Sequence, residues 1–300
     1  MSTPKVSVII PVHNRATTLG RAIRSVQAQT MTDWELIVVD DASTDGTPAF
    51  VESFAEPRIR LLRHHQNRGP SVARQTGIDP ARGEFIALLD SDDEWLPEKL
   101  ERQLSTGGAV VACGCFEIVD GVEEEFIHPP VEDWVEHLHF RSMLRAGSTL
   151  LARRDAVISA GGFDPALRYY EDWDLVLGLA AANPITLVPE ALARIHVTGL
   201  RSMRAAEPSV RRFLEKHDAA FRRIGNAHRR LVRGQHFQNL AAGAFAERQF
   251  GAGARWLIES FVNNPLQSPI RLAALGLAPI DALCGTSLIA RAAGMRRSKQ

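Results

Sequence analysis

The sequence has 300 residues, 45% hydrophobic and 23% charged, which is the composition of an ordinary globular protein with a core that needs no disulfides. Lysine plus arginine and aspartate plus glutamate number 35 each, so no overall charge draws the chain to nucleic acid or to anionic lipid, and we expect no nucleic-acid partner. The three cysteines lack zinc-type spacing. Cys113 and Cys115 would point to the same face of a strand, and we interpret all three as reduced core thiols.

The ends of the chain bear on its location. Residues 1–5 lack the apolar core of a signal peptide, which argues against export through a cleaved signal. The best candidate for a membrane span, 272–290, is interrupted by Pro279 and Asp281. We therefore expect a cytoplasmic protein, with peripheral contact at the inner face of the membrane as an alternative.

The first third of the chain alternates between two apolar patterns. Apolar runs predict strands, and helical spacing of apolar residues predicts helices that begin after Thr17 and at Thr47 and a third over 71–78. This alternation favours an α/β fold with a mostly parallel sheet and helices on both faces. Such sheets bind ligands at the carboxyl ends of their strands. The predicted strands are 6–10, 36–39, 59–62 and 85–89.

Polar residues follow three of these strands. Residues 11–15 come after the first, 40–46 after the second and 90–93 after the fourth. Since parallel strands bring their carboxyl ends to one edge of a sheet, the three clusters predict a single site.

Asp90, Asp92 and Asp93 lie within four positions directly after the apolar run 85–89. Carboxylates this close repel one another unless a cation neutralises them. Mg²⁺ or Mn²⁺ usually takes one or two protein carboxylates and leaves other positions for phosphate oxygens, so an Asp-x-Asp pair suits a metal shared with a substrate. The alternative is an acidic turn that caps a helix beginning at Pro97.

Asp41 lies in the polar run 40–46 after the second strand. A carboxylate at the tip of a strand can accept a hydrogen bond from the imide N–H of uracil, and the ring of His13 can stack on the base. The two residues would then form a pyrimidine pocket. The alternative is that 40–46 forms an Asx turn leading into the next helix.

Five segments carry a resemblance to a known family: 6–14 (VSVIIPVHN), 38–47 (VVDDASTDGT), 67–74 (NRGPSVAR), 89–93 (LDSDD) and 162–175, where Gly-Phe-Asp leads to Glu-Asp-Trp-Asp-Leu. In this order they resemble the inverting glycosyltransferases of family 2, which have the GT-A fold. The resemblance covers about two thirds of the chain and implies a GT-A-type, Rossmann-like catalytic domain over 1–203. The apolar patterns after it predict a helical extension over 204–300.

The resemblance also implies a nucleotide-sugar donor, usually a UDP-sugar, and a divalent metal, Mn²⁺ or Mg²⁺. Asp41 matches the position that binds the base and Arg74 a position that contacts the nucleotide. The implied donor-binding residues are Pro11, His13, Asn14, Asp41, Arg74, Asp90 and Ser91.

For the metal, the resemblance implies Asp92 as a direct ligand, Asp90 facing the ribose or the metal, and His196 approaching the metal or diphosphate. A packed histidine is the alternative for His196. Asp172 matches the catalytic base, and Glu171 beside it is the competitor. Alternatively, Glu171, Asp172 and Asp174 simply enrich the first turn of a helix with negative charge.

Two positions depart from the family pattern. His13 stands where many members have tyrosine, so it stacks over less area. Gln75 replaces the asparagine that commonly follows the arginine, and the sequence offers no account of its effect.

The rest of the chain is less informative. Aromatic and histidine side chains in 123–145 suit an acceptor site and ordinary packing equally well. Residues 204–264 predict helices, among them a hairpin of tetratricopeptide type that we expect to cover the catalytic domain. Residues 269–300 suit either an anionic membrane surface or a terminal helix with a basic end. The predicted helical faces are Val210, Phe213, Leu214, His217, Phe221 and Ile224; Phe237, Leu240, Ala241, Ala244 and Phe245; and Trp256, Leu257 and Phe261.

The sequence thus predicts an inverting glycosyltransferase that passes a sugar to a glycan or lipid-linked acceptor in bacterial surface polysaccharide or lipid-linked glycan synthesis. A sugar nucleotidyltransferase would carry a glycine-rich basic loop after the first strand, which 11–15 is not. A non-catalytic protein that binds glycans or nucleotide sugars remains the other alternative.

Overall fold

The computed structural model describes residues 3–197 and 203–264. Contacts within the chain divide it into two compact units, Met1–Thr198 and Gly199–Gln300, and the division lies close to the boundary that we placed after residue 203. Each unit is described by itself.

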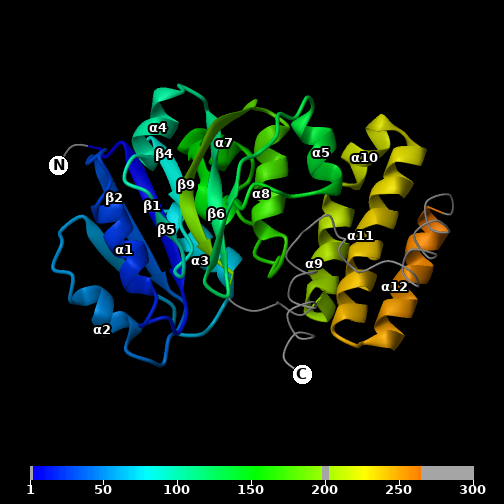
Figure 1. Ribbon diagram of the computed structural model, residues 1–300, viewed down its shortest axis with the longest axis horizontal. Helices are drawn as coiled ribbons and strands as arrows, with labels where there is room; N and C mark the ends of the chain where they lie inside the picture. Colours follow the sequence, from blue (N-terminus) through cyan, green and yellow to red (C-terminus); the bar gives the residue numbers. More distant parts are fainter. Residues whose placement is uncertain (1–2, 198–202, 265–300) are drawn as a thin grey trace. The chain divides into compact units, whose positions relative to one another are not determined.

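The first unit combines a sheet with helices, and the second is helical (Figure 1). The strands are β1 (Val6–Val12), β2 (Trp34–Asp40), β3 (Ile59–Arg63), β4 (Phe85–Leu88), β5 (Glu94–Trp95), β6 (Val110–Val119), β7 (Val122–Phe126), β8 (Leu150–Arg153) and β9 (Ile185–His196). The helices beside them are α1 (Leu19–Gln27), α2 (Thr47–Glu52), α3 (Pro70–Ile78), α4 (Lys99–Ser105), α5 (Trp134–Phe140), α6 (Ala146–Thr149), α7 (Arg154–Ser159) and α8 (Glu171–Ala180). The second unit contains α9 (Met203–Lys216), α10 (Asp218–Ile224), α11 (Asn226–Ala246) and α12 (Phe250–Asn263).

The sheet has the strand order β3-β2-β1-β4-β8-β6-β9-β5, with β7 beside β6. From β3 to β4 every pair is parallel, which confirms the α/β fold predicted from the alternating patterns. Beyond β4 the sheet is mixed, because β8 runs antiparallel to both β4 and β6 while β6 and β9 are parallel. Since β2, β1 and β4 are parallel neighbours, the chain leaves all three at the same edge of the sheet.

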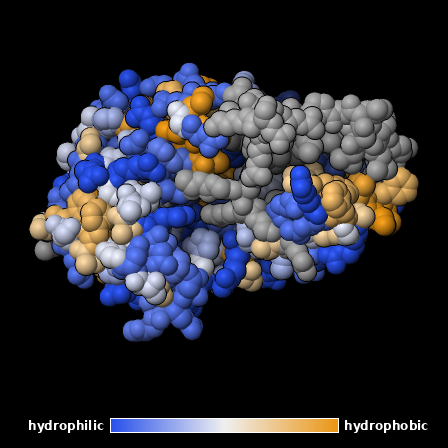
Figure 2. All heavy atoms as spheres, turned by 60° about the horizontal axis from the view of Figure 1, so that its bottom comes forward, coloured by the Kyte–Doolittle hydropathy of each residue, from blue (hydrophilic) through white to orange (hydrophobic). Residues whose placement is uncertain are grey.

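In the second unit, α11 and α12 pack together as the predicted hairpin. The two helices pack so closely at Gly253 that a Cβ there would lie only 2.8 Å from the Phe245 ring. Two of the predicted core positions are wrong: Ile224 is 54% exposed and Phe261 is 43% exposed. Phe261 is turned by about 140° from the buried Trp256, since successive residues of a helix are about 100° apart. Figure 2 shows apolar side chains on the surface of this unit.

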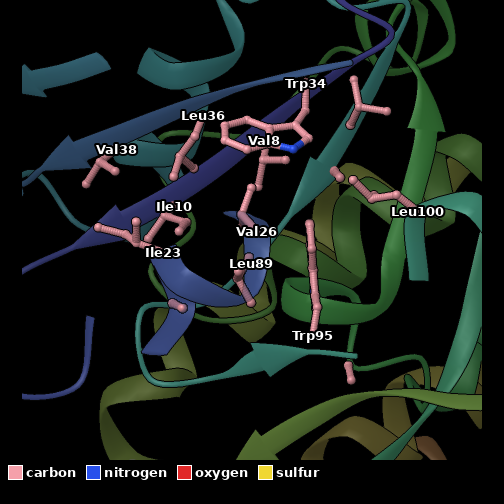
Figure 3. Packing of buried hydrophobic residues seen from close by; sticks show 14 of the residues in the cluster. Val8, Ile10, Ile23, Val26, Trp34, Leu36, Val38, Leu89, Trp95 and Leu100 are labelled. Carbon is pink, nitrogen blue, oxygen red and sulfur yellow. The ribbon is translucent and has the colours of Figure 1, made fainter. Parts of the chain in front are cut away.

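The main core of the first unit lies between the sheet and α1. Val8 and Ile10 of β1 point toward Ile23 and Val26 of α1 (Figure 3). The opposite face of the sheet is covered by α3, where a Cβ at Gly77 would lie 2.6 Å from the Ile9 side chain. Helices therefore cover both faces, as expected, and they fix the sheet edge at which the polar clusters lie.

The prediction for the two cysteines of β6 is partly wrong. Cys113 and Cys115 are buried and free, as expected. However, Cys113 packs with Val188, whereas Cys115 belongs to the core between the sheet and α1. The register between β6 and β9 shifts on both sides of Gly114, and such a bulge breaks the alternation of faces along a strand. Cys284 lies outside the described residues.

Lys99 is fully buried at the start of α4. Its Nζ donates a hydrogen bond to Gln103 Oε1 at 2.6 Å and lies 4.2 Å from the centre of the Trp95 ring. Among the residues that the structure describes, no carboxylate forms an ion pair with it. Burial lowers the pKa of Lys99 to about 8.

The free energy of unfolding should therefore rise with pH through this lysine. The unfolded chain keeps the proton up to a pKa of 10.5, whereas the folded chain releases it above about 8, so the unfolded state binds more protons between these values. The rise should reach roughly 3 kcal/mol, and Lys99→Met should lack it. Urea unfolding across this pH range measures the difference. The exposed control Lys216→Met should keep the rise, and an unchanged rise in Lys99→Met would contradict the prediction.

No helix in the two described ranges is both long and apolar enough to cross a bilayer. The segments 272–290 and 269–300, for which we considered a membrane span and a membrane surface, lie outside the described residues.

Candidate functional site

Arg74 of α3 lies at the centre of an ion-pair network at the sheet edge. Its Nη2 donates a hydrogen bond to Asp90 Oδ1 at 2.6 Å, and its Nη1 donates to Glu171 Oε1 at 2.9 Å. The Arg74 and Glu171 side chains are both buried. The network therefore joins the aspartate after β4 to the first residue of α8.

The surroundings of Arg74 favour the charged form of its side chain. Burial alone would lower the pKa of Arg74, but the negative charges of Asp90, Glu171 and Asp172 raise it above its ordinary value. The guanidinium carbon also lies 5.5 Å from the centre of the Phe163 ring. One buried cation thus interacts with three neighbouring carboxylates and is hydrogen-bonded to two of them.

Further hydrogen bonds tie α3 to the segment before α8. Gln75 Oε1 accepts from the Phe163 N–H at 2.9 Å, and Gln75 Nε2 donates to Asp79 Oδ1 at 2.7 Å. The Ser71 hydroxyl donates to the Leu167 carbonyl. The sequence offered no account of Gln75, and the structure supplies one: this side chain fastens the turn at 162–163 to α3.

Glu171 and Asp172 are adjacent but differ in their surroundings. Glu171 is 3% exposed and occupied by Arg74, whereas Asp172 is half-buried. Asp172 Oδ1 accepts only a local hydrogen bond in this network, from the Trp173 N–H at 2.8 Å. Both residues lie in the first turn of α8 with Asp174, so the helix does gain the negative charge of the alternative interpretation. Of the two predicted residues, Asp172 is the one with access to solvent.

Asp93 anchors the acidic turn to two neighbouring elements, a role that the sequence did not reveal. Its Oδ2 accepts from the Ser148 hydroxyl at 2.5 Å, and its Oδ1 accepts from the His196 N–H at 2.9 Å. Burial raises the pKa of Asp93 well above its ordinary range, and the charges of Asp90 and Asp92 add to this effect. Asp93 therefore fastens the turn to α6 and to the end of β9.

Gly147 of α6 is required by the position of Asp90. A Cβ at Gly147 would lie 2.5 Å from Asp90 Oδ2, much closer than atoms in contact can lie. Gly147→Ala should push this carboxylate out of its ion pair with Arg74 and lower the free energy of unfolding by about 1–3 kcal/mol, as overpacking does. Urea unfolding measures the loss. The control is Gly46→Ala, where a Cβ has no neighbour within 4 Å, and equal stability of the two variants would contradict the prediction.

Asp41 is buried after β2, and its carboxylate is largely occupied. Oδ1 accepts from the Arg68 N–H at 2.8 Å and contacts His64 Nδ1 at 2.7 Å, and Oδ2 accepts from the Gly69 N–H at 2.8 Å. A carboxylate has about four acceptor positions, so one remains for another donor. The His13 ring lies beside it, with Nδ1 2.8 Å from the Asp41 carbonyl oxygen.

The remaining predicted donor-binding residues, and Asp40 beside them, mostly make contacts that hold the backbone in place. Asn14, at a φ of 52°, accepts from the Thr44 N–H at 2.8 Å and donates its own N–H to Ser43 Oγ at 2.8 Å. Asp40 Oδ1 accepts from the Ser43 N–H at 3.1 Å, and Asp45 Oδ1 accepts from the Thr47 N–H at 2.9 Å, which is the Asx turn leading into α2 that we considered as an alternative. Pro11 pairs with Val39 within the sheet, and Ser91 is buried in the acidic turn.

The predicted metal ligands do not form a complete coordination site by themselves. Asp92 is half-buried, and its carbonyl accepts from Arg21 Nε at 2.9 Å. His196 Nε2 lies 3.7 Å from Glu94 Oε1, and burial together with the charge of Arg21 lowers the pKa of His196. Within the described part of the chain, no three His, Cys, Asp or Glu side chains are arranged to hold a metal. Asp90 and Asp92 still offer the oxygens that suit Mg²⁺ or Mn²⁺, which needs one or two protein carboxylates.

Comparison with known proteins decides the family. Residues 7–158, which include the sheet edge up to the acidic turn, match the family described as "Glycosyl transferase family 2". The chain belongs to this family. The chain is 36% identical over 212 residues to the succinoglycan biosynthesis protein ExoO of Rhizobium meliloti, covering 65% of the chain and 61% of ExoO.

A second relative is the E. coli protein WfgD, named UDP-Glc:alpha-D-GlcNAc-diphosphoundecaprenol beta-1,3-glucosyltransferase, which is 46% identical over 100 residues. That match covers 33% of our chain and 40% of WfgD, so the chain spans less than two thirds of both relatives. Among solved structures, TarS residues 1–349 of S. aureus in complex with UDP-GlcNAc gives a TM-score of 0.58 at 17% identity, covering 87% of the chain and 92% of that 1–349 fragment. At this identity the likeness concerns the fold, and it confirms the predicted GT-A class.

Proposed function

We propose that this glycosyltransferase moves a sugar from a UDP-sugar to a hydroxyl of a glycan or lipid-linked acceptor, with a divalent metal and with inversion at the anomeric carbon. The observation that carries the proposal is the Arg74 network, because it holds the acidic turn and the first turn of α8 at one place. The names of ExoO and WfgD favour a role in bacterial surface polysaccharide or lipid-linked glycan synthesis. The complex of TarS with UDP-GlcNAc favours a uridine nucleotide.

The donor base would bind at Asp41 and His13. The remaining acceptor position of the Asp41 carboxylate suits the imide N–H of uracil, and the exposed ring of His13 offers a stacking surface. Asn14 and Ser91 would shape the pocket through the loops that they fix. Arg74, whose two terminal nitrogens are occupied by carboxylates, would position Asp90 and Glu171 rather than bind the nucleotide through them.

The metal would be held by Asp92 and Asp90, with His196 near it. When bound, a divalent cation supplies Lewis-acid stabilisation to the negative charge that develops on the departing diphosphate. The two carboxylates contribute hard oxygen ligands and leave the other positions to the donor.

Asp172 would act as the catalytic base. As the acceptor oxygen attacks the anomeric carbon, the bond from that carbon to the diphosphate oxygen breaks, and the hydroxyl proton passes to the Asp172 carboxylate. Glu171 is the weaker candidate because its carboxylate is buried in the ion pair with Arg74. A single displacement at the anomeric carbon, without a second nucleophile, inverts the configuration of that carbon.

Thermal unfolding of the purified protein with a panel of nucleotides and nucleotide sugars, with and without Mn²⁺, tests the proposal. UDP-sugars at a hundred times their Kd should stabilise the fold by about 2.7 kcal/mol, and Mn²⁺ should enhance the effect. Asp92→Asn should lose the Mn²⁺-dependent part, whereas Asp120→Asn, at an exposed turn, should keep it. A full Mn²⁺ effect in Asp92→Asn would remove this residue from the metal site. No shift with any nucleotide would refute the proposed donor.

A further inference from the structure

Helix α12 exposes an apolar face that its hairpin partner does not cover. Phe250 is 65% exposed, Ile258 64%, Phe261 43% and Val262 64%. The opposite side of α12, with Trp256, is buried. Soluble proteins rarely expose a cluster of large apolar side chains without a use for it, so the outward face of α12 indicates a further contact.

The charge of the chain is divided unevenly between its two parts. Residues 203–264 contain eleven lysine and arginine residues but only five aspartate and glutamate residues. Residues 1–202 contain nineteen basic and twenty-nine acidic residues, so the overall balance hides the excess of each part. A strong asymmetry of this kind is typical of a chain with one part that faces an anionic surface.

Basic side chains border the apolar face of α12. Arg230 Nη2 donates a hydrogen bond to the Val262 carbonyl at 3.3 Å, at the end of the helix. Arg248 is exposed in the turn just before Phe250. Arg255 is 57% exposed along one edge, where it also pairs with Glu207. Arginines thus flank both ends and one edge of the apolar face.

We propose that the outward face of α12 docks on an anionic phospholipid bilayer. The apolar side chains would enter the boundary between headgroups and acyl chains, and the flanking arginines would bind the lipid phosphates. A soluble polyanion would leave the phenylalanines and aliphatic side chains without a partner, and a purely apolar surface would leave the arginines without one. The proposal does not depend on the transfer reaction or on the identity of the donor.

Sedimentation of the full chain with lipid vesicles tests this surface. The protein should bind vesicles of equal parts phosphatidylglycerol and phosphatidylcholine, and binding should weaken in salt and be lost with phosphatidylcholine alone. Ile258→Asp should weaken binding at least about tenfold. Arg248→Gln should weaken it about fivefold, since each basic residue near an anionic surface contributes about 1 kcal/mol. The control is Ile158→Asp, the same change at an isoleucine that is 56% exposed in α7, and it should bind as the parent does.

Other outcomes would overturn the proposal. Equal binding to both kinds of vesicle, no binding, or full binding by Ile258→Asp would each exclude an anionic bilayer at this face. A dimer that Ile258→Asp dissociates, without lipid binding, would assign the face to a second copy of the chain. A lower melting temperature in Ile258→Asp than in Ile158→Asp, again without lipid binding, would assign it to residues 265–300. The UDP-sugar shift should be the same in all these variants, so failure here is distinct from failure of the proposed donor.

Discussion

Asp172→Asn is expected to bind the UDP-sugar as well as the parent protein does while transferring sugar about a thousandfold more slowly. The amide keeps the size of the side chain and can still meet the Trp173 N–H through its oxygen, but it cannot take the acceptor proton. Steady-state transfer and donor-induced thermal shifts, measured on the same samples, separate chemistry from binding.

Two companion variants sharpen this experiment. Asp155→Asn makes the same change in the first turn of α7, where the side chain is 71% exposed, and should transfer at the parent rate. Glu171→Gln should lose stability because it leaves Arg74 with one carboxylate fewer. If Asp172→Asn transfers at the parent rate and folded Glu171→Gln does not, the base is Glu171 and the assignment is wrong.

Arg74→Met should lower the free energy of unfolding by about 3–5 kcal/mol, because it leaves the buried Glu171 carboxylate and the Asp90 carboxylate without their cation. Urea unfolding measures the loss. Arg24→Met, at an exposed arginine in the last turn of α1, should cost far less.

The cause of that loss can be tested by adding substitutions. Asp90→Asn and Glu171→Gln remove the two carboxylate charges, so adding them to Arg74→Met should recover part of the lost stability. Each should destabilise the parent protein when introduced alone. If the triple variant is no more stable than Arg74→Met, the loss comes from packing against Phe163 rather than from unpaired charge.

The parallel half of the sheet was predictable because its signals are local. Buried strands read as apolar runs, and the turns between them carry their own polar residues, so β1 to β4 could be placed from short stretches of sequence. The other half depends on pairing between distant segments. The contact of β6 with β9, and the bulge at Gly114 that separates the environments of Cys113 and Cys115, arise only when those segments meet.

The candidate site shows the same division. Asp41, Asp90 and Asp92 could be selected because each follows a strand, and parallel strands end at one edge. The hydrogen-bond partners of these side chains could not be predicted, because they lie far away in the sequence. Arg74 and Glu171, for example, are ninety-seven positions apart. For the same reason the fastening role of Gln75 became visible only in the structure.

The bonds between α3 and residues 163–171 have a consequence for exchanging segments between members of the family. Ser71, Arg74 and Gln75 hold Leu167, Glu171 and Phe163 in turn. If residues 162–180 were replaced by those of a relative, these hydrogen bonds would be lost unless α3 was replaced as well. The two segments, almost a hundred residues apart, form one unit of exchange for anyone who recombines this enzyme with its family.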